Sequence, residues 1–355
     1  MISKWVAAAA LAVLYSFGAA AHADVQYKIV TASERGTYIQ IGRDLAKYVA
    51  PQAGIDLAVL PSAGSSENVK RLRYEPGVKL AMVQSDVYQA LLDQDRLGNK
   101  TAGALIRPLR VIMPLYNEEI YFITRADAPM EFVHQIKDAR INVGPLLSGT
   151  AMSATTLYRQ MFGAAIPELK TSYLSNEEAL AKLTEDKTVD VVVVVAGQPA
   201  KLLADMTPEA RKLIKLLKFD ASVPESQEAL KTYFAATVRA SNYPNLLTAD
   251  LPAIAVKAYL VTYDFTTGAT APQLKKFARS LCENFGKLQA LGHPKWHEVE
   301  LAMPALGRGW IYYPTTAHEL QACSGAKPPI PVPAVTTPPS TKSCNQQERI
   351  LGLCN

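Results

Sequence analysis

The sequence predicts an α/β protein made of two lobes, and three observations predict it. The chain has 355 residues, which at roughly 150 residues per domain suffices for about two domains. Hydrophobic residues make up 49% and charged residues 19%, which excludes disorder for most of the chain and supplies a sizeable core. Strand and helix patterns alternate in one set before residue 90 and in another after residue 110, so two α/β units are expected in tandem.

Residues 1–23 carry the three parts of a secretory signal peptide. Lys4 stands in a short n-region, an apolar stretch begins at Trp5, and Ala21-His22-Ala23 is a small-x-small cleavage site. The apolar stretch is shorter than the roughly 20 residues that a membrane span needs, and no longer one follows. We therefore expect cleavage before Asp24 and a soluble mature chain in the periplasm.

The first unit reads β-α-β-α-β. Strands are expected at 26–31, 56–60 and 79–83, and helices near 39–49 and from Glu67 onward. Apolar residues recur at helical spacing along the first helix, and Pro51 and Gly54 end it. This order implies a parallel sheet covered by helices.

The second unit repeats the alternation. Strands are expected at 111–113, 120–123, 140–143 and 189–195, and helices at 151–162, 177–183 and 207–217. The run 189–195 is rich in valine, which is typical of a strand buried on both faces. A strand at 253–260 and a long amphipathic helix at 272–291 follow, and the proline-rich residues 327–339 predict an extended linker.

Four loops are expected beyond the carboxyl ends of parallel strands, where α/β proteins bind ligands. They cover 33–38, 63–68, 84–86 and 144–150 and are rich in Gly, Ser, Thr, Asn or Gln. Three precede helices, whose free N–H groups attract anions, although an ordinary N-cap also explains any single loop. Together the loops predict a site for a small polar ligand that carries a carboxylate.

Other chemistries lack support in the sequence. The stretch 144–150 resembles a phosphate-binding loop without its lysine, and Ser148 does not stand in a nucleophile elbow. Pro294 interrupts the i, i+4 spacing of His293 and His297, which excludes a zinc motif on a helix. The 37 basic residues are nearly balanced by 32 acidic ones and form no stripe. We expect no enzyme activity, no cofactor or metal, and no nucleic-acid partner.

The four cysteines are expected to pair in an oxidising periplasm. One pairing joins Cys282 to Cys323 and Cys344 to Cys354, so that each bridge is local. The alternative pairing of Cys323 with Cys344 would fold the tail back on the body. Unpaired thiols in a disordered tail are the third possibility.

Several segments in order resemble one family. GTYIQIG at 36–42 is similar to the GTYY-x-x-G segment of the TAXI family, the solute receptors of tripartite ATP-independent periplasmic (TRAP) transporters. Similar segments follow at 64–69, 83–86, 143–150, 196–199, 242–244, 274–288 and 312–314, so the resemblance covers about residues 25–320.

The resemblance implies a type II periplasmic-binding-protein fold, in which two α/β lobes joined by a hinge flank a ligand cleft. It also implies that a small carboxylate, such as a glutamate-like amino acid or an organic acid, is delivered to a TRAP permease. The residues carried over as ligand contacts are Gly36, Thr37, Tyr38, Ser65, Asn68, Gln84, Ser85, Asp86, Ser148, Gly149, Thr150 and Gln198. Asp86 would pair with a ligand amine or order a loop, and Tyr38, Tyr116 and Tyr243 would wall the ligand.

The sequence departs from the family pattern at the first loop. Ser33-Glu34-Arg35 replaces a glycine-rich stretch, and Ile39 replaces the second tyrosine of the motif. Arg35 would either pair with a ligand carboxylate or form a surface ion pair with Glu34. The proline-rich tail lies outside the pattern.

These observations predict a domain order and a function. Lobe 1 is expected to comprise 24–113 and 249–322, lobe 2 to comprise 114–248, and the tail to comprise 323–355. The leading hypothesis is a monomeric receptor that closes on its ligand. The alternatives are a ligand sensor or scaffold that signals to a membrane partner and docks through the tail, and a hydrolase built on Ser148.

Overall fold

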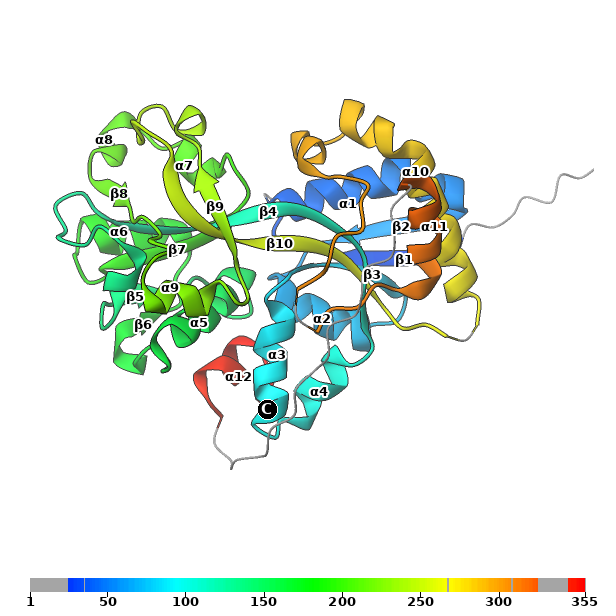
Figure 1. The fold of residues 1–355 in the computed structure, drawn as a ribbon, viewed down its shortest axis with the longest axis horizontal. Coiled ribbons are helices and arrows are strands. Elements are labelled where there is room, and N and C mark those ends of the chain that lie inside the picture. The colour runs from blue at the N-terminus through cyan, green and yellow to red at the C-terminus, as the bar shows by residue number, and fades with distance from the viewer. Residues whose placement is uncertain (1–24, 35, 267, 308, 325–343, 355) are drawn as a thin grey trace, which may run out of the picture.

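A computed structural model describes residues 25–34, 36–266, 268–307, 309–324 and 344–354 (Figure 1). The expected signal peptide, Arg35 and the proline-rich stretch lie outside the described residues. Among the described residues, no helix combines the length and the apolarity needed to cross a membrane.

Lobe 1 is built on three parallel strands, in the order β2-β1-β3. Its first elements are β1 (Val25–Val30), α1 (Thr37–Tyr48), β2 (Ile55–Leu60), α2 (Ser65–Tyr74), β3 (Val78–Gln84), α3 (Val87–Arg96) and α4 (Lys100–Ile106). The expected β-α-β-α-β order is therefore confirmed, whereas α3 and α4 were not anticipated. Gly42 lets α1 pack closely on the sheet, because a Cβ there would lie 2.9 Å from Cγ1 of Val59.

Two long antiparallel strands, β4 (Leu109–Arg125) and β10 (Leu251–Tyr263), run through both lobes (Figure 1). The expected strands at 111–113 and 120–123 are two parts of β4. Pro114 is tolerated inside this strand because it lies opposite Tyr259, where the register with β10 shifts. The described sheet is continuous, in the order β2-β1-β3-β10-β4-β7-β5-β6.

Lobe 2 surrounds the other half of this sheet. Its elements are β5 (Ile141–Asn142), α5 (Gly149–Phe162), β6 (Thr171–Ser172), α6 (Asn176–Thr184), β7 (Val191–Ala196), α7 (Lys201–Ala204), α8 (Pro208–Arg211), β8 (Ile214–Leu216), α9 (Pro224–Ala229) and β9 (Phe234–Val238). The first four valines of β7 are buried, as expected for a central strand.

The expected helix at 207–217 is wrong. Only α8 is helical there, and the chain then forms β8, which pairs antiparallel with the end of β4. Ile214 and Leu216 are buried on one face of β8 while Leu213 before it is exposed. Pairing with the free edge of β4 satisfies backbone groups and buries both side chains, which outweighs the helical spacing of the leucines.

The chain then returns to lobe 1 with α10 (Thr270–Leu291) and α11 (Pro314–Ser324). The short α12 (Gln346–Ile350) lies against both α3 of lobe 1 and α5 of lobe 2. Short 3-10 helices cover Pro51–Ala53, Val133–Ile136, Glu168–Lys170, Ala240–Asn242 and Pro294–Glu298. The structure pairs Cys282 with Cys323 and Cys344 with Cys354, which is the local pairing.

The main core joins the two lobes. It includes the strands of lobe 1, both long strands, and residues of lobe 2 such as Met152 and Leu157 on α5. A smaller cluster around Tyr121 and Val194 fills the far side of lobe 2. The expected architecture of two α/β lobes joined by hinge strands is confirmed, and the structure holds the lobes against each other.

Candidate functional site

Asn68 on α2 connects the loops after β1 and β2 to the end of β3. Its Nδ2 donates to the backbone oxygens of Thr31 and of Met82, the latter at 2.7 Å, and its Oδ1 accepts from Oγ of Ser62 at 2.6 Å. The side chain is fully buried. Asn68 therefore holds the loops after β1 and β2 against the end of β3, and its amide is used within the protein.

Ser65 and Gln84 are joined in the same region. Oγ of Ser65 accepts from the backbone N–H of Gln84 at 3.0 Å and donates to its Oε1 at 3.3 Å. The start of α2 is thereby fixed against the end of β3. Ser65 and Gln84 therefore lie together, as expected if the loops after the parallel strands converge.

The first turns of α2 and α5 face each other across the boundary between the lobes. A Cβ on Gly64, the N-cap of α2, would lie 2.9 Å from the backbone nitrogen of Gly149 on α5. A Cβ on Gly149 would in turn collide with Oε1 of Gln84. The two glycines permit this close approach, so predicted residues of both lobes are brought together.

Several N–H groups at these helix starts are free of side-chain caps. The N-caps of α1 and α2 are Gly36 and Gly64, which have no side chain to cap the first turn, although Oγ of Ser62 accepts from the N–H of Gly64 itself at 3.1 Å. Oγ of Ser66, which is buried in the first turn of α2, has no partner among the described residues. In α5, by contrast, Oγ of Ser148 accepts from the backbone of Ala151 at 3.0 Å. Uncapped helix starts are suited to an anionic group.

Three carboxyl groups, Asp86, Glu118 and Glu119, are buried near the meeting point of the lobes. We call Asp86 and Glu118 the buried acidic cluster, because Glu119, as the next residue of β4, points to the opposite face of the sheet. Asp86, Glu118 and Glu119 are 0%, 7% and 5% exposed. Asp86 precedes α3 in lobe 1, and the two glutamates lie in the middle of β4. No cation among the described residues forms an ion pair with any of them.

Burial disfavours the charged forms of these groups. It raises the pKa of Asp86 to about 6, against a lowering influence from the hydroxyls of Ser153 and Tyr233. The hydroxyls of Ser153 and Tyr233 lie near the carboxyl group of Asp86, but neither makes a hydrogen bond of regular geometry with its two oxygens. Burial also raises the pKa of Glu118 to about 7, and that of Glu119 rises for the same reason.

Two tyrosines line the cluster. The hydroxyl of Tyr38 donates to Oε2 of Glu118 at 2.8 Å, which connects the start of α1 to the hinge strand β4. The hydroxyl of Tyr116 is buried near Glu118 and has no partner among the described residues. Both predicted residues therefore lie at the meeting point of the lobes.

Lys295 enters the same region from lobe 1. It is 4% exposed, and its Nζ lies 5.6 Å from the centre of the Tyr116 ring. Both oxygens of Glu298 lie 2.7 Å from Nζ, so this ammonium is already paired. A Cβ on Gly197 would lie 2.6 Å from Cε of Lys295, which places the lysine against the loop after β7.

Three other predicted contacts are occupied within the protein. Ser85 extends the pairing of β3 with β10, since its Oγ accepts from the backbone of Lys257 at 3.1 Å. The amide of Gln198 bonds to the backbone of Thr237 and Arg239. The hydroxyl of Tyr243 contacts that of Tyr121 at 2.9 Å inside the smaller core of lobe 2.

Two further predicted residues are Thr150, which the structure describes, and Arg35, which it does not. Thr150 lies in the first turn of α5, and its Cγ2 is close to Gly144. Arg35 lies outside the described residues. Glu34 forms a surface ion pair with Arg43, at 3.5 Å.

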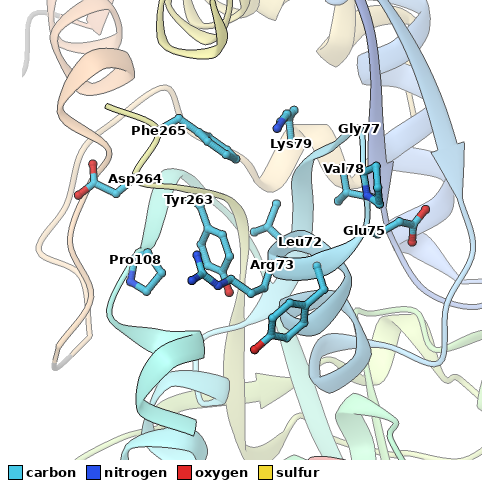
Figure 2. Close-up of a pocket in the computed structure, with 12 residues that line it drawn as sticks. Leu72, Arg73, Glu75, Gly77, Val78, Lys79, Pro108, Tyr263, Asp264 and Phe265 are labelled. Carbon is cyan, nitrogen blue, oxygen red and sulfur yellow. The ribbon is translucent and has the colours of Figure 1, made fainter. Parts of the chain in front are cut away.

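A hollow of about 270 Å³ opens beside the start of β3, at the other end of lobe 1 (Figure 2). Its wall includes Val78, the first residue of β3, whereas the converging loops follow Gln84 at the last residue of that strand. Arg73 lies over the ring of Tyr263 at 5.8 Å, and Nζ of Lys79 lies 4.4 Å from the ring centre of Phe265. The hollow is therefore separate from the candidate site.

Three buried charged residues near the site, Glu118, Glu119 and Lys295, were not predicted from the sequence. A signal for the glutamates exists, because two adjacent charges interrupt an otherwise apolar strand pattern from Val111 to Ile123. Lys295 carries no such signal, since its burial depends on Gly197, which is about a hundred residues away in the chain.

Comparison with known proteins gives a family and a set of similar structures. A family model described as NMT1-like matches residues 29–309. Similar solved structures include XAC2383 from Xanthomonas citri bound to chloride ion, at 14% identity over 84% of this chain and 96% of that chain, with a TM-score of 0.44. They also include the periplasmic binding protein BugD, at 15% identity over 77% of this chain and 84% of the BugD chain, with a TM-score of 0.42. The periplasmic sulfonate-binding protein SsuA from Methylobacillus flagellatus KT matches at 10% identity over 85% of this chain and 78% of the SsuA chain, with a TM-score of 0.44.

Proposed function

Because this chain belongs to the NMT1-like family, we propose that it is a periplasmic solute-binding receptor without catalytic activity. One observation carries the proposal. The uncapped start of α2 in lobe 1 meets the start of α5 in lobe 2 through Gly64 and Gly149, so a ligand held there would contact both lobes at once.

The proposed mechanism is closure of the lobes about the long strands β4 and β10. Contacts from both lobes are available together only when the lobes meet. A ligand that needs both sets of contacts therefore binds the closed state better and shifts the population toward it. The closed surface is then what a membrane partner would recognise.

The proposed ligand is a small carboxylate, either a glutamate-like amino acid or an organic acid. The free N–H groups at the starts of α1 and α2, and the unpartnered hydroxyl of Ser66, support an anionic group at this position. The proposed partner is a TRAP permease, as the TAXI-like segments imply. We also retain as proposals the monomeric state and the lobes 24–113 with 249–322 and 114–248.

A ligand sensor that docks through its tail is the competing function. The described part of the tail packs on the protein's own lobes, with Ile350 and Leu351 fully buried. This arrangement leaves α12 little surface for a partner, so the receptor function is preferred. A hydrolase built on Ser148 is disfavoured, because that hydroxyl caps α5.

A thermal-shift screen of the refolded, ligand-stripped mature chain (24–355) tests the proposal. The panel holds amino acids, 2-oxo acids and dicarboxylates. A ligand at 100 times its Kd adds about 2.7 kcal/mol, which should raise the Tm by several degrees. A flat panel from folded protein overturns the carboxylate ligand. Uptake into vesicles that carry a TRAP permease, dependent on added receptor, tests the partnership.

A further inference from the structure

The described C-terminal segment, residues 344–354, folds as a small closed unit. A disulfide joins Cys344 to Cys354, ten residues further along the chain. Between them α12 begins with a capping box, in which Asn345 and Glu348 each accept a hydrogen bond from the other's backbone N–H, at 2.9 Å and 3.0 Å. Both features fix the shape of the segment from within. The segment can therefore bind to the rest of the protein, or leave it, as a unit.

Lobe 1 holds one side of this segment. Nδ2 of Asn345 donates to Oε1 of Gln94 on α3 at 3.0 Å. Nδ2 of Asn99, the N-cap of α4, donates to Oε1 of Glu348 at 2.8 Å. The first turn of α12 is thereby attached to two helices of lobe 1.

Lobe 2 holds the other side. Three side chains of α12 donate to it: Gln347 to the buried hydroxyl of Thr156 at 2.8 Å, Gln346 to the hydroxyl of Thr171 at 3.1 Å, and Arg349 to the carboxylate of Glu168 at 2.6 Å. Figure 1 shows α12 beside α3 and below α5, with one lobe on each side. The segment therefore bridges the two lobes.

The turn after α12 lies between the two elements that meet at the proposed site. Nζ of Lys70 on α2 donates to the backbone oxygen of Gly352. A Cβ on Gly352 would lie 2.6 Å from that Nζ and 2.9 Å from Cδ2 of Leu147, in the loop before α5. Because Leu147 is two residues from Gly149, the segment reaches the boundary of the lobes where α2 and α5 meet.

Apolar contacts make the bridge part of the core. Ile350 and Leu351 are 0% and 1% exposed, and both belong to the main core that joins the lobes. An ion pair between Arg159 of α5 and Asp93 of α3 joins the lobes directly, next in sequence to Gln94. Separation of the lobes would expose these apolar side chains and break the polar bonds on one side of the segment.

We propose that residues 344–354 are an intramolecular latch, which holds the lobes together in the absence of ligand. This inference rests on the proposed receptor function, since it concerns how the site of that receptor opens. The lobes separate at the α2–α5 boundary only when the segment leaves one of them. Ligand entry is thus coupled to release of the C-terminal segment, and the latch shifts the population toward the closed state.

Hydrogen exchange of the ligand-free mature chain tests the latch. The first N–H groups of α2 and α5 have no acceptor within their own helix, so their exchange reports whether the lobes meet there. Gln346→Ala/Arg349→Ala removes contacts to lobe 2 alone, and we expect peptides covering 64–70 and 147–153 to exchange at least threefold faster. Cys344→Ser/Cys354→Ser, which opens the loop of the segment, should have the same effect.

Each latch variant has a matched control. Gln227→Ala/Lys231→Ala also removes a glutamine and a cation, but their bonds lie within lobe 2. Cys282→Ser/Cys323→Ser removes a disulfide that lies within lobe 1. Neither control should change the exchange of the two boundary peptides relative to peptides of β7.

The outcomes separate this inference from the proposed function. Faster exchange of both boundary peptides in either latch variant, with β7 unchanged, supports the latch. Unchanged exchange in both variants overturns it. A rise of equal size in β7 also overturns it, because the segment would then stabilise the whole fold rather than hold the lobes together. The measurement uses no ligand, so a flat ligand panel does not alter it, and loss of the latch leaves the receptor function standing.

Discussion

Glu118→Gln should stabilise the ligand-free protein at alkaline pH. Glu118 is buried, and burial raises its pKa from 4.5 to about 7. The folded state therefore keeps a proton that the unfolded state loses between pH 4.5 and pH 7. By linkage, this group lowers the stability of the fold as pH rises through that window.

The size of the effect follows from the shift. A change from 4.5 to about 7 corresponds to a penalty on the order of 3 kcal/mol, fully expressed above pH 7 and absent below pH 4.5. Glutamine is neutral at every pH, fills the same volume, and can still accept the hydrogen bond from Tyr38. The variant should therefore gain about 3 kcal/mol at pH 8 and almost nothing at pH 4.5.

Urea unfolding of the ligand-free mature chain at pH 4.5 and pH 8 measures this difference, with Glu300→Gln as the exposed control. A Glu118→Gln protein that is no more stable than wild type at pH 8 would refute the reasoning. So would a gain of equal size at both pH values, because a titrating group cannot produce it. The expected result would mean that the protein gives up stability to keep an ionisable group where the lobes meet.

Two further predictions concern other parts of the molecule. Gly149→Ala should weaken ligand binding at least tenfold by calorimetry, because its Cβ would obstruct the meeting of α5 with lobe 1. Gly286→Ala, in a part of α10 with nothing within 4 Å, is the control, and it should leave affinity unchanged and add up to about 1 kcal/mol of stability. Loss of the Cys282–Cys323 bond, whose cysteines are 41 residues apart, should lower the unfolding free energy by about 4 kcal/mol in denaturant titrations, and a loss below 1 kcal/mol would contradict the entropic argument.

Much of the candidate site follows from local rules of sequence. In a parallel sheet, the loops after successive strands meet at one edge, so Asn68, Gln84 and the start of α2 could be placed together from strand order alone. Gly149 could be added because it opens a helix after a strand of the second unit. Which side chains face the ligand was harder to predict. Asn68 and Ser85 have polar side chains, but both are consumed by the backbone of their own lobe.

The remaining features depend on contacts that are distant in sequence. The apolar pattern around Leu213 fits a helix, but the free edge of β4 makes residues Ile214–Leu216 a strand. Lys295 is buried only because Gly197, from the other lobe, leaves room for it. Such facts require the tertiary structure, since no local pattern distinguishes a buried lysine from an exposed one.

The place of β10 in the sheet also governs the order in which this chain can fold. β10 lies between β3 and β4, so the middle of the described sheet is completed by the last of its strands along the chain. Before β10 inserts, β3 and β4 each present an unpaired, apolar edge. Such edges pair readily with other chains, and contacts of long sequence separation form slowly. The yield of folded protein should therefore be set by the insertion of β10 rather than by the stability of the finished fold.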